Sequence, residues 1–94
     1  MLSKIPLDFS KATKENLDKE ILRAGIIAEL DAINLYEQMA ALATDPDLKN
    51  VLLDIAREEK THVGEFQTML LRLDAEQVEE MEHAKEEIKE LTGK

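Results

Sequence analysis

The 94-residue sequence contains no cysteine, and its charge is strongly unbalanced toward acids. Without cysteine, disulfides, cysteine-ligated zinc or iron–sulfur sites and a thiol nucleophile are excluded. Aspartate and glutamate number 21 against 12 lysines and arginines, which gives a formal charge of −9. An acidic surface disfavours binding to nucleic acid phosphates and to anionic lipids. We therefore expect neither nucleic acid nor a membrane as a partner.

Long hydrophobic runs, aromatic residues and helix breakers are also scarce. The weakly charged stretch at residues 35–44 contains Glu37 and has about half the length needed to span a bilayer. The N-terminus lacks the apolar segment of a signal peptide, which predicts a cytoplasmic protein. Alanine, leucine, glutamate and lysine dominate, and all four favour helices. The length and composition together predict a single all-α domain.

Capping signals divide the chain into predicted elements. Thr13 is the expected N-cap of a first helix. Asp45 is the expected N-cap of a second helix, with Pro46 at the first helical position, where a missing N–H is harmless. Asp74 followed by Gln77 resembles a capping box and favours a third helix; the alternative is that the second helix continues through this point. We expect an irregular lead-in and three helices, over residues 1–12, 13–43, 46–73 and 75–92. The short connection between the first two helices predicts an antiparallel hairpin.

Each of the two long helices carries a glutamate at the centre of an apolar face. Successive residues of a helix are rotated by about 100°, so the direction of a side chain follows from its number. In the first helix the residues within about 60° of Glu29 include Leu22, Ile26, Ile33, Tyr36 and Ala40. In the second helix those within about 60° of Glu59 include Leu48, Leu52, Ile55, Ala56, His62, Val63, Phe66, Leu70 and Leu73.

A carboxylate that faces an apolar core is costly unless a cation or a proton neutralises it. No lysine or arginine lies near Glu29 or Glu59 on these faces. Glu59 and His62 form a Glu-x-x-His pair, which places an oxygen and a nitrogen ligand on adjacent turns of one helix. Carboxylates combined with an imidazole suit iron, manganese or zinc. We therefore predict that Glu29, Glu59 and His62 bind a metal.

These residues are half of a di-iron ligand set. Di-iron carboxylate bundles take one glutamate from each of two helices and a Glu-x-x-His pair from each of two others. This chain supplies one of each, and a two-helix hairpin also leaves much of both apolar faces exposed. Two chains that pack face to face would form a four-helix bundle and bring four carboxylates and two histidines together. The sequence therefore predicts a homodimer at minimum.

Residues 27–36 (IAELDAINLY) and 57–62 (REEKTH) resemble the encapsulated ferritins, which are half-length ferritin-like proteins housed inside encapsulin shells. The resemblance covers roughly residues 22–73 and is nearest to the archaeal type that is fused to the shell protein. It implies a ferroxidase that oxidises Fe(II) with O₂ at a di-iron centre shared between two subunits. It also implies a decameric ring that feeds iron mineralisation and storage inside an encapsulin nanocompartment in the cytoplasm.

Carried over by position, the resemblance makes Glu29, Glu59 and His62 the iron ligands and places Tyr36 beside the centre as a further catalytic residue. Asp31 occupies one of two outer acidic positions that attract metal in this family. Ala28 stands at the other, where the family has an acid. The resemblance therefore leaves the route of metal uptake open for this chain.

A second Glu-x-x-His string, Glu80 to His83, tests how specific the motif is. His83 points away from the apolar stripe of the third helix, so we expect this pair to be exposed and to bind no metal. Glu58 also lies one turn before His62 and could compete with Glu59, but it is about 100° off the apolar face.

Two other functions fit the sequence. The chain could be a non-catalytic oligomerisation module whose metal is structural, which would show no redox turnover. It could also be a rubrerythrin-like peroxidase, although the cysteine-ligated iron domain that usually supplies electrons to such enzymes is absent from this sequence.

Overall fold

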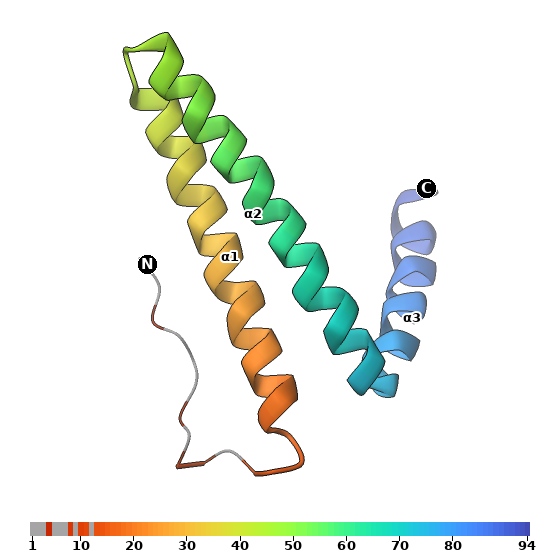
Figure 1. Cartoon of the computed structure of the whole chain (residues 1–94). Helices are drawn as coiled ribbons and strands as arrows, with labels where there is room; N and C mark the ends of the chain where they lie inside the picture. The colour runs from red at the N-terminus through yellow and green to blue at the C-terminus, as the bar shows by residue number, and fades with distance from the viewer. Residues whose placement is uncertain (1–3, 5–7, 9, 12) are drawn as a thin grey trace.

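The computed structural model describes residues 4, 8, 10–11 and 13–94, and this part of the chain contains three helices and no strand. The helices are α1 (Leu17–Leu42), α2 (Pro46–Leu73) and α3 (Ala75–Thr92). Figure 1 shows α1 and α2 side by side as an antiparallel hairpin, with α3 diverging from it. The predicted all-α fold is confirmed. None of these three helices combines the length and the apolarity that crossing a membrane requires. The predicted irregular lead-in lies largely outside the described residues.

The prediction for the start of the first helix was wrong, because α1 begins at Leu17 and not at Thr13. The Thr13 hydroxyl accepts a hydrogen bond from the backbone N–H of Asn16 (3.3 Å), and the Thr13 carbonyl accepts from the same N–H (3.1 Å). These bonds close a turn over residues 13–16 that leads directly into α1, so Thr13 lies four residues before the first residue of the helix. The N-cap is Asn16, whose side chain makes no capping hydrogen bond. At the other end, Ala43 is already extended (φ −66°, ψ 138°).

The hairpin connection follows the predicted capping chemistry. The Asp45 carboxylate accepts a hydrogen bond from the backbone N–H of Asp47 (2.9 Å), and Pro46 occupies the first position of α2. This arrangement satisfies one of the free N–H groups at the start of the helix, and proline removes another. As a result α2 has the bounds expected from the sequence, and the two long helices run antiparallel.

Asp74 ends α2 and begins α3. Its backbone (φ −129°, ψ 86°) leaves the helical region, and its side chain accepts a hydrogen bond from the N–H of Gln77 (3.0 Å). The second helix therefore does not continue, and the predicted start of a third helix at Asp74 is confirmed. Only one half of the capping box is formed, because the N–H of Asp74 donates to the carbonyl of Leu70 (3.0 Å). The same carboxylate pairs with Arg23 of α1 (Nη2 to Oδ2, 2.9 Å). The Arg23–Asp74 pair thus ties the start of the hairpin to the point where α3 turns away, and α3 has no buried residue of its own.

Replacement of Asp74 by alanine is expected to lower the thermal unfolding midpoint by a few degrees at neutral pH. The N–H of Gln77 and then the Arg23 guanidinium hold the pKa of Asp74 below its ordinary value of 3.8. Because the folded-state pKa is lowered, the stabilisation is complete above about pH 4 and is lost as the pH falls below that value. The difference between the wild type and the variant should therefore shrink in acid. Thermal denaturation followed by circular dichroism checks this, and a difference that is independent of pH would contradict it.

The core between α1 and α2 is thin. Its buried residues are Ala24, Ile33, Ala40, Leu52, Ala56 and Leu70, so half of them are alanines. Many larger apolar side chains are exposed; among them are Ile27, Leu30, Leu42, Leu48, Val51 and Met69. Leu42 and Leu91 are each 82% exposed. Extensive exposed apolar surface on a small protein marks an interaction surface.

Candidate metal centre

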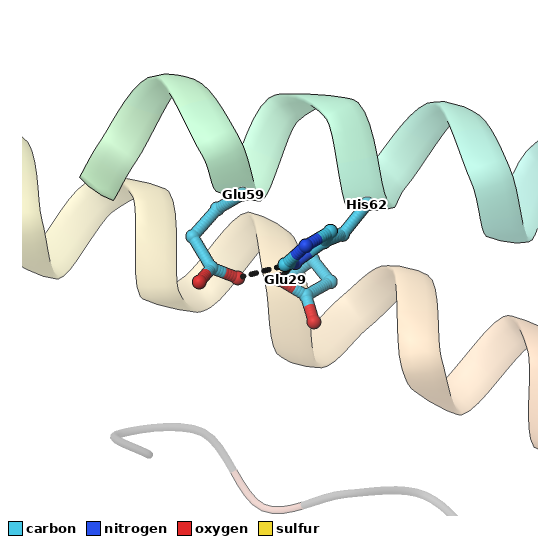
Figure 2. A group of neighbouring side chains, drawn as sticks. All are labelled: Glu29, Glu59 and His62. Carbon is cyan, nitrogen blue, oxygen red and sulfur yellow. Dashed lines mark ion pairs between the residues drawn. The ribbon is translucent and has the colours of Figure 1, made fainter. Parts of the chain in front are cut away.

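Glu29, Glu59 and His62 meet at the middle of the hairpin. Glu29 lies at the midpoint of α1, and Glu59 and His62 lie around the midpoint of α2. Because the two helices are antiparallel, their midpoints come together. Figure 2 shows the imidazole of His62 turned toward both carboxylates, with Glu29 contributed by the opposite helix. The apolar periodicity that centres each face on a glutamate therefore places all three side chains on one side of the hairpin.

The three side chains have the spacing of a metal site. One possible ligand atom from each lies within 4.8 Å of those of the other two. His62 Nδ1 is 3.5 Å from Oε2 of Glu29 and 3.5 Å from Oε2 of Glu59. The side chains of both glutamates are 19% exposed and that of His62 is 46% exposed. The site is thus half-buried against the hairpin and open on its outer side.

The charge of the two carboxylates is not balanced by a basic residue. In the described part of the chain, the ion pairs of Glu29 and Glu59 both go to His62. Lys60, the nearest lysine in sequence, pairs instead with Glu37 of α1 (Nζ to Oε2, 3.1 Å). Two close carboxylates with one imidazole therefore carry excess negative charge, which favours a divalent cation.

Glu29 Oε2 is buried and accepts no hydrogen bond from the described residues. A buried oxygen of this kind is costly unless water, a proton or a metal satisfies it. Glu20 Oε2 is the other such atom in the described part of the chain, but it lies about 180° around α1 from Glu29. Glu20 belongs to no group of three possible ligands there. The orphaned oxygen of Glu29, in contrast, lies within a set of donors that fits iron.

The remaining predicted site residues lie around this group. Tyr36 is half-buried and follows Glu29 by two turns of α1, on the same face. Asp31 is half-buried too, but it is rotated by about 200° from Glu29 and lies outside the three-residue group. Ala28, at the other outer position, offers no ligand atom. A role for Tyr36 beside the centre and for Asp31 in attracting metal stays a prediction.

The second Glu-x-x-His string lies on the outside of α3, as predicted. The side chains of Glu80 and His83 are 64% and 59% exposed, and His83 pairs with Glu80 and with Glu87 at 3.3 Å each. Among the described residues these side chains form no group with the spacing of a metal site. Glu58 is exposed as well. The same motif is therefore a candidate site only where a second helix supplies another carboxylate.

Sequence reasoning missed two of the ion pairs that join α1 to other described residues, Lys60–Glu37 and Arg23–Asp74. Both link residues far apart in the sequence. Which lysine or arginine meets which acid depends on how far one helix is shifted along the other. Charge pairs at i,i+4 can be recognised within one helix, but no comparable spacing marks a pair between helices.

Comparison with known proteins places this hairpin in a family. The rubrerythrin family pattern matches residues 20–92. The crystal structure of the encapsulated ferritin domain from Pyrococcus furiosus matches with a TM-score of 0.85 and 54% identity, over 100% of this chain and 98% of that one. This chain belongs to the encapsulated ferritins. The predicted resemblance is therefore confirmed for the whole described fold, α3 included.

Two curated relatives of this encapsulated ferritin are parts of encapsulin systems. The ferritin-like–encapsulin shell fusion protein of Pyrococcus furiosus is 64% identical over 81 residues, which is 86% of this chain and 23% of the fusion protein. The encapsulin nanocompartment cargo protein EncC of Myxococcus xanthus is 40% identical over 78 residues, which is 83% of this chain and 57% of EncC. The chain thus spans less than a quarter of the first relative and just over half of the second.

Proposed function

We propose that this encapsulated ferritin is a ferroxidase, which oxidises Fe(II) with O₂ at a di-iron centre shared between two copies of the chain. The observation that carries this proposal is the convergence of Glu29, Glu59 and His62, with one buried carboxylate oxygen that accepts no hydrogen bond. Iron is the substrate here. Each pair of Fe(II) ions gives two electrons to O₂, which takes up two protons and leaves as hydrogen peroxide while both ions become Fe(III).

The site needs a second copy because one chain supplies only half of a di-iron ligand set. Glu29 and Glu59 lie at the midpoints of their helices. A two-fold axis beside them would therefore overlap both hairpins along their full length of about 40 Å. This packing would also cover exposed apolar side chains on the Glu59 face of α2, such as Leu48 and Leu73. Four carboxylates then balance the charge of two divalent ions, and the two His62 side chains provide the nitrogen ligands.

The carboxylates of Glu29 and Glu59 would favour the oxidation of Fe(II), because they are negatively charged, hard oxygen ligands. Carboxylate oxygens bind Fe(III) more strongly than Fe(II), so Glu29 and Glu59 would stabilise the product ion and provide driving force. His62 Nδ1 faces both carboxylates and would complete the ligand set. In this scheme Tyr36 packs beside the centre. Asp31, about 200° around α1 from Glu29, would attract Fe(II) to the outer surface of the hairpin and would not bind it at the centre.

The relatives suggest where the Fe(III) product is stored. One is fused to an encapsulin shell protein and another is a nanocompartment cargo protein. We infer that this chain also works inside an encapsulin shell in the cytoplasm, as a decameric ring. In that setting Fe(III) leaves the shared centre and is mineralised and stored in the shell interior, because an open ring has no closed cavity of its own.

Aerobic addition of Fe(II), followed by ferric absorbance, tests the proposal. We expect oxidation much faster than in buffer, saturating at about one iron per chain, as a two-ion site between two chains requires. Tight metal binding with no oxidation above the buffer rate would make the site structural and the protein an oligomerisation module. A strong preference for peroxide over O₂ would instead support a rubrerythrin-like peroxidase.

A further inference from the structure

Gly25 of α1 lies directly against the aromatic ring of Phe66. A Cβ atom at Gly25 would be 3.1 Å from Cε2 of Phe66 and 3.2 Å from both Cδ2 and Cζ. These distances are shorter than an ordinary van der Waals contact. Glycine is disfavoured relative to alanine in the interior of a helix, so its presence in α1 needs a reason. The close approach of the Phe66 ring to bare backbone supplies one.

The Gly25–Phe66 contact lies one helical turn from the candidate metal ligands on both α1 and α2. Gly25 precedes Glu29 by four residues, and Phe66 follows His62 by four residues. Because α1 and α2 are antiparallel, the ring contact and the ligand group are adjacent levels of the hairpin, roughly 6 Å apart along the axis. Gly64, the other glycine inside a long helix, differs sharply, because a Cβ there would meet nothing within 4 Å.

The separation of the two helices at this level determines the geometry of the ligands. Glu29 comes from α1, whereas Glu59 and His62 come from α2. A Cβ atom at position 25 would force the Phe66 ring to shift by a few tenths of an ångström, and α2 would shift with the ring if the ring cannot turn aside alone. Metal–ligand distances tolerate changes of only about 0.2 Å. A shift of α2 on that scale would therefore change the distance of Glu59 and His62 from Glu29 enough to disturb metal binding.

We propose that Gly25 and Phe66 are positioning residues for the metal centre, which act through the spacing of α1 and α2. This inference rests on the proposed metal site. Neither residue offers a metal ligand or a proton, so their effect is confined to where Glu29 lies relative to Glu59 and His62. The Phe66 ring packs directly on the backbone of Gly25, so a substitution at either position changes how the other residue packs.

Titration with Co(II) alone, followed by its visible absorption, tests the proposal in the full chain. We expect Gly25→Ala to weaken Co(II) binding about tenfold, the scale of changes to groups that support metal ligands. The helix content and the unfolding temperature of the metal-free protein should stay equal or rise, because alanine favours helix. Adding Phe66→Leu should recover most of the affinity, since leucine lacks the Cε2 and Cζ atoms that crowd the new methyl group. Gly64→Ala is the matched control and should bind Co(II) like the wild type.

The possible outcomes separate this inference from the proposed function. If the wild type binds Co(II) and Gly25→Ala binds it equally well, the positioning role is overturned and the metal site stands. If the affinity falls but Phe66→Leu does not restore it, the effect does not pass through the ring and the inference is again overturned. If the wild type itself does not bind Co(II), the proposed function fails and this inference with it. Should Gly25→Ala not fold, Phe66→Leu alone is expected to weaken binding, and adding alanine at position 25 should improve it.

Discussion

His62→Ala is expected to reduce the initial rate of aerobic Fe(II) oxidation by more than about 100-fold, whereas His83→Ala leaves it unchanged. Changes to groups that merely support a ligand already cost 10–100-fold in metal binding or activity, and His62 would be a ligand itself. Both histidines follow a glutamate by three residues. The two variants therefore compare the same local motif with and without a second carboxylate from another helix.

The glutamates provide a second matched pair for this prediction. Glu29→Ala should match His62→Ala, and Glu80→Ala should match the wild type. Stopped-flow absorbance of ferric products gives the initial rates, and circular dichroism shows whether each variant keeps its helices. His83 and Glu80 are largely exposed on α3, so their replacement should not disturb the hairpin. Equal losses in all four variants would show that the active face has been assigned wrongly.

Metal removal is expected to dissociate the dimer. In the proposed four-helix bundle four carboxylates face one another, and two unit charges about 6 Å apart repel by about 3 kcal/mol at an effective dielectric of about 20. A divalent ion removes this repulsion and adds bonds to both chains. We therefore expect a chelator to weaken dimerisation by about 100-fold or more. Analytical ultracentrifugation of metal-free and metal-loaded protein measures the change.

A charge-neutral variant separates repulsion from bonding in this experiment. Glu29→Gln combined with Glu59→Gln keeps the shape of both side chains and removes the four charges from the shared site. This double variant should dimerise without metal, because the exposed apolar faces still favour association. It should also fail to respond to added Fe(II) or Zn(II). An association constant that is the same with and without metal in the wild type would contradict a metal bridge between the chains.

Local sequence signals were sufficient for most helix boundaries and for the members of the candidate site. Asp45 and Pro46 marked the start of α2, and Asp74 marked both its end and the start of α3. Capping acts between residues two or three positions apart, so it can be recognised without knowledge of the fold. The direction of Glu29, Glu59 and His62 followed from helical periodicity alone. The start of α1 was misplaced because the Thr13 hydroxyl accepts the hydrogen bond typical of an N-cap, but the three residues after it form a turn and the helix begins only at Leu17.

The contacts between helices required the folded structure. The pairing of Lys60 with Glu37, the link from Arg23 to the α3 junction and the seat of Phe66 on Gly25 all depend on how far one helix is shifted along the other. That shift is a compromise among many side chains of both helices, and no short motif encodes it. Periodicity states which face of a helix is apolar, but only the packed hairpin decides which residues meet across it and at what distance.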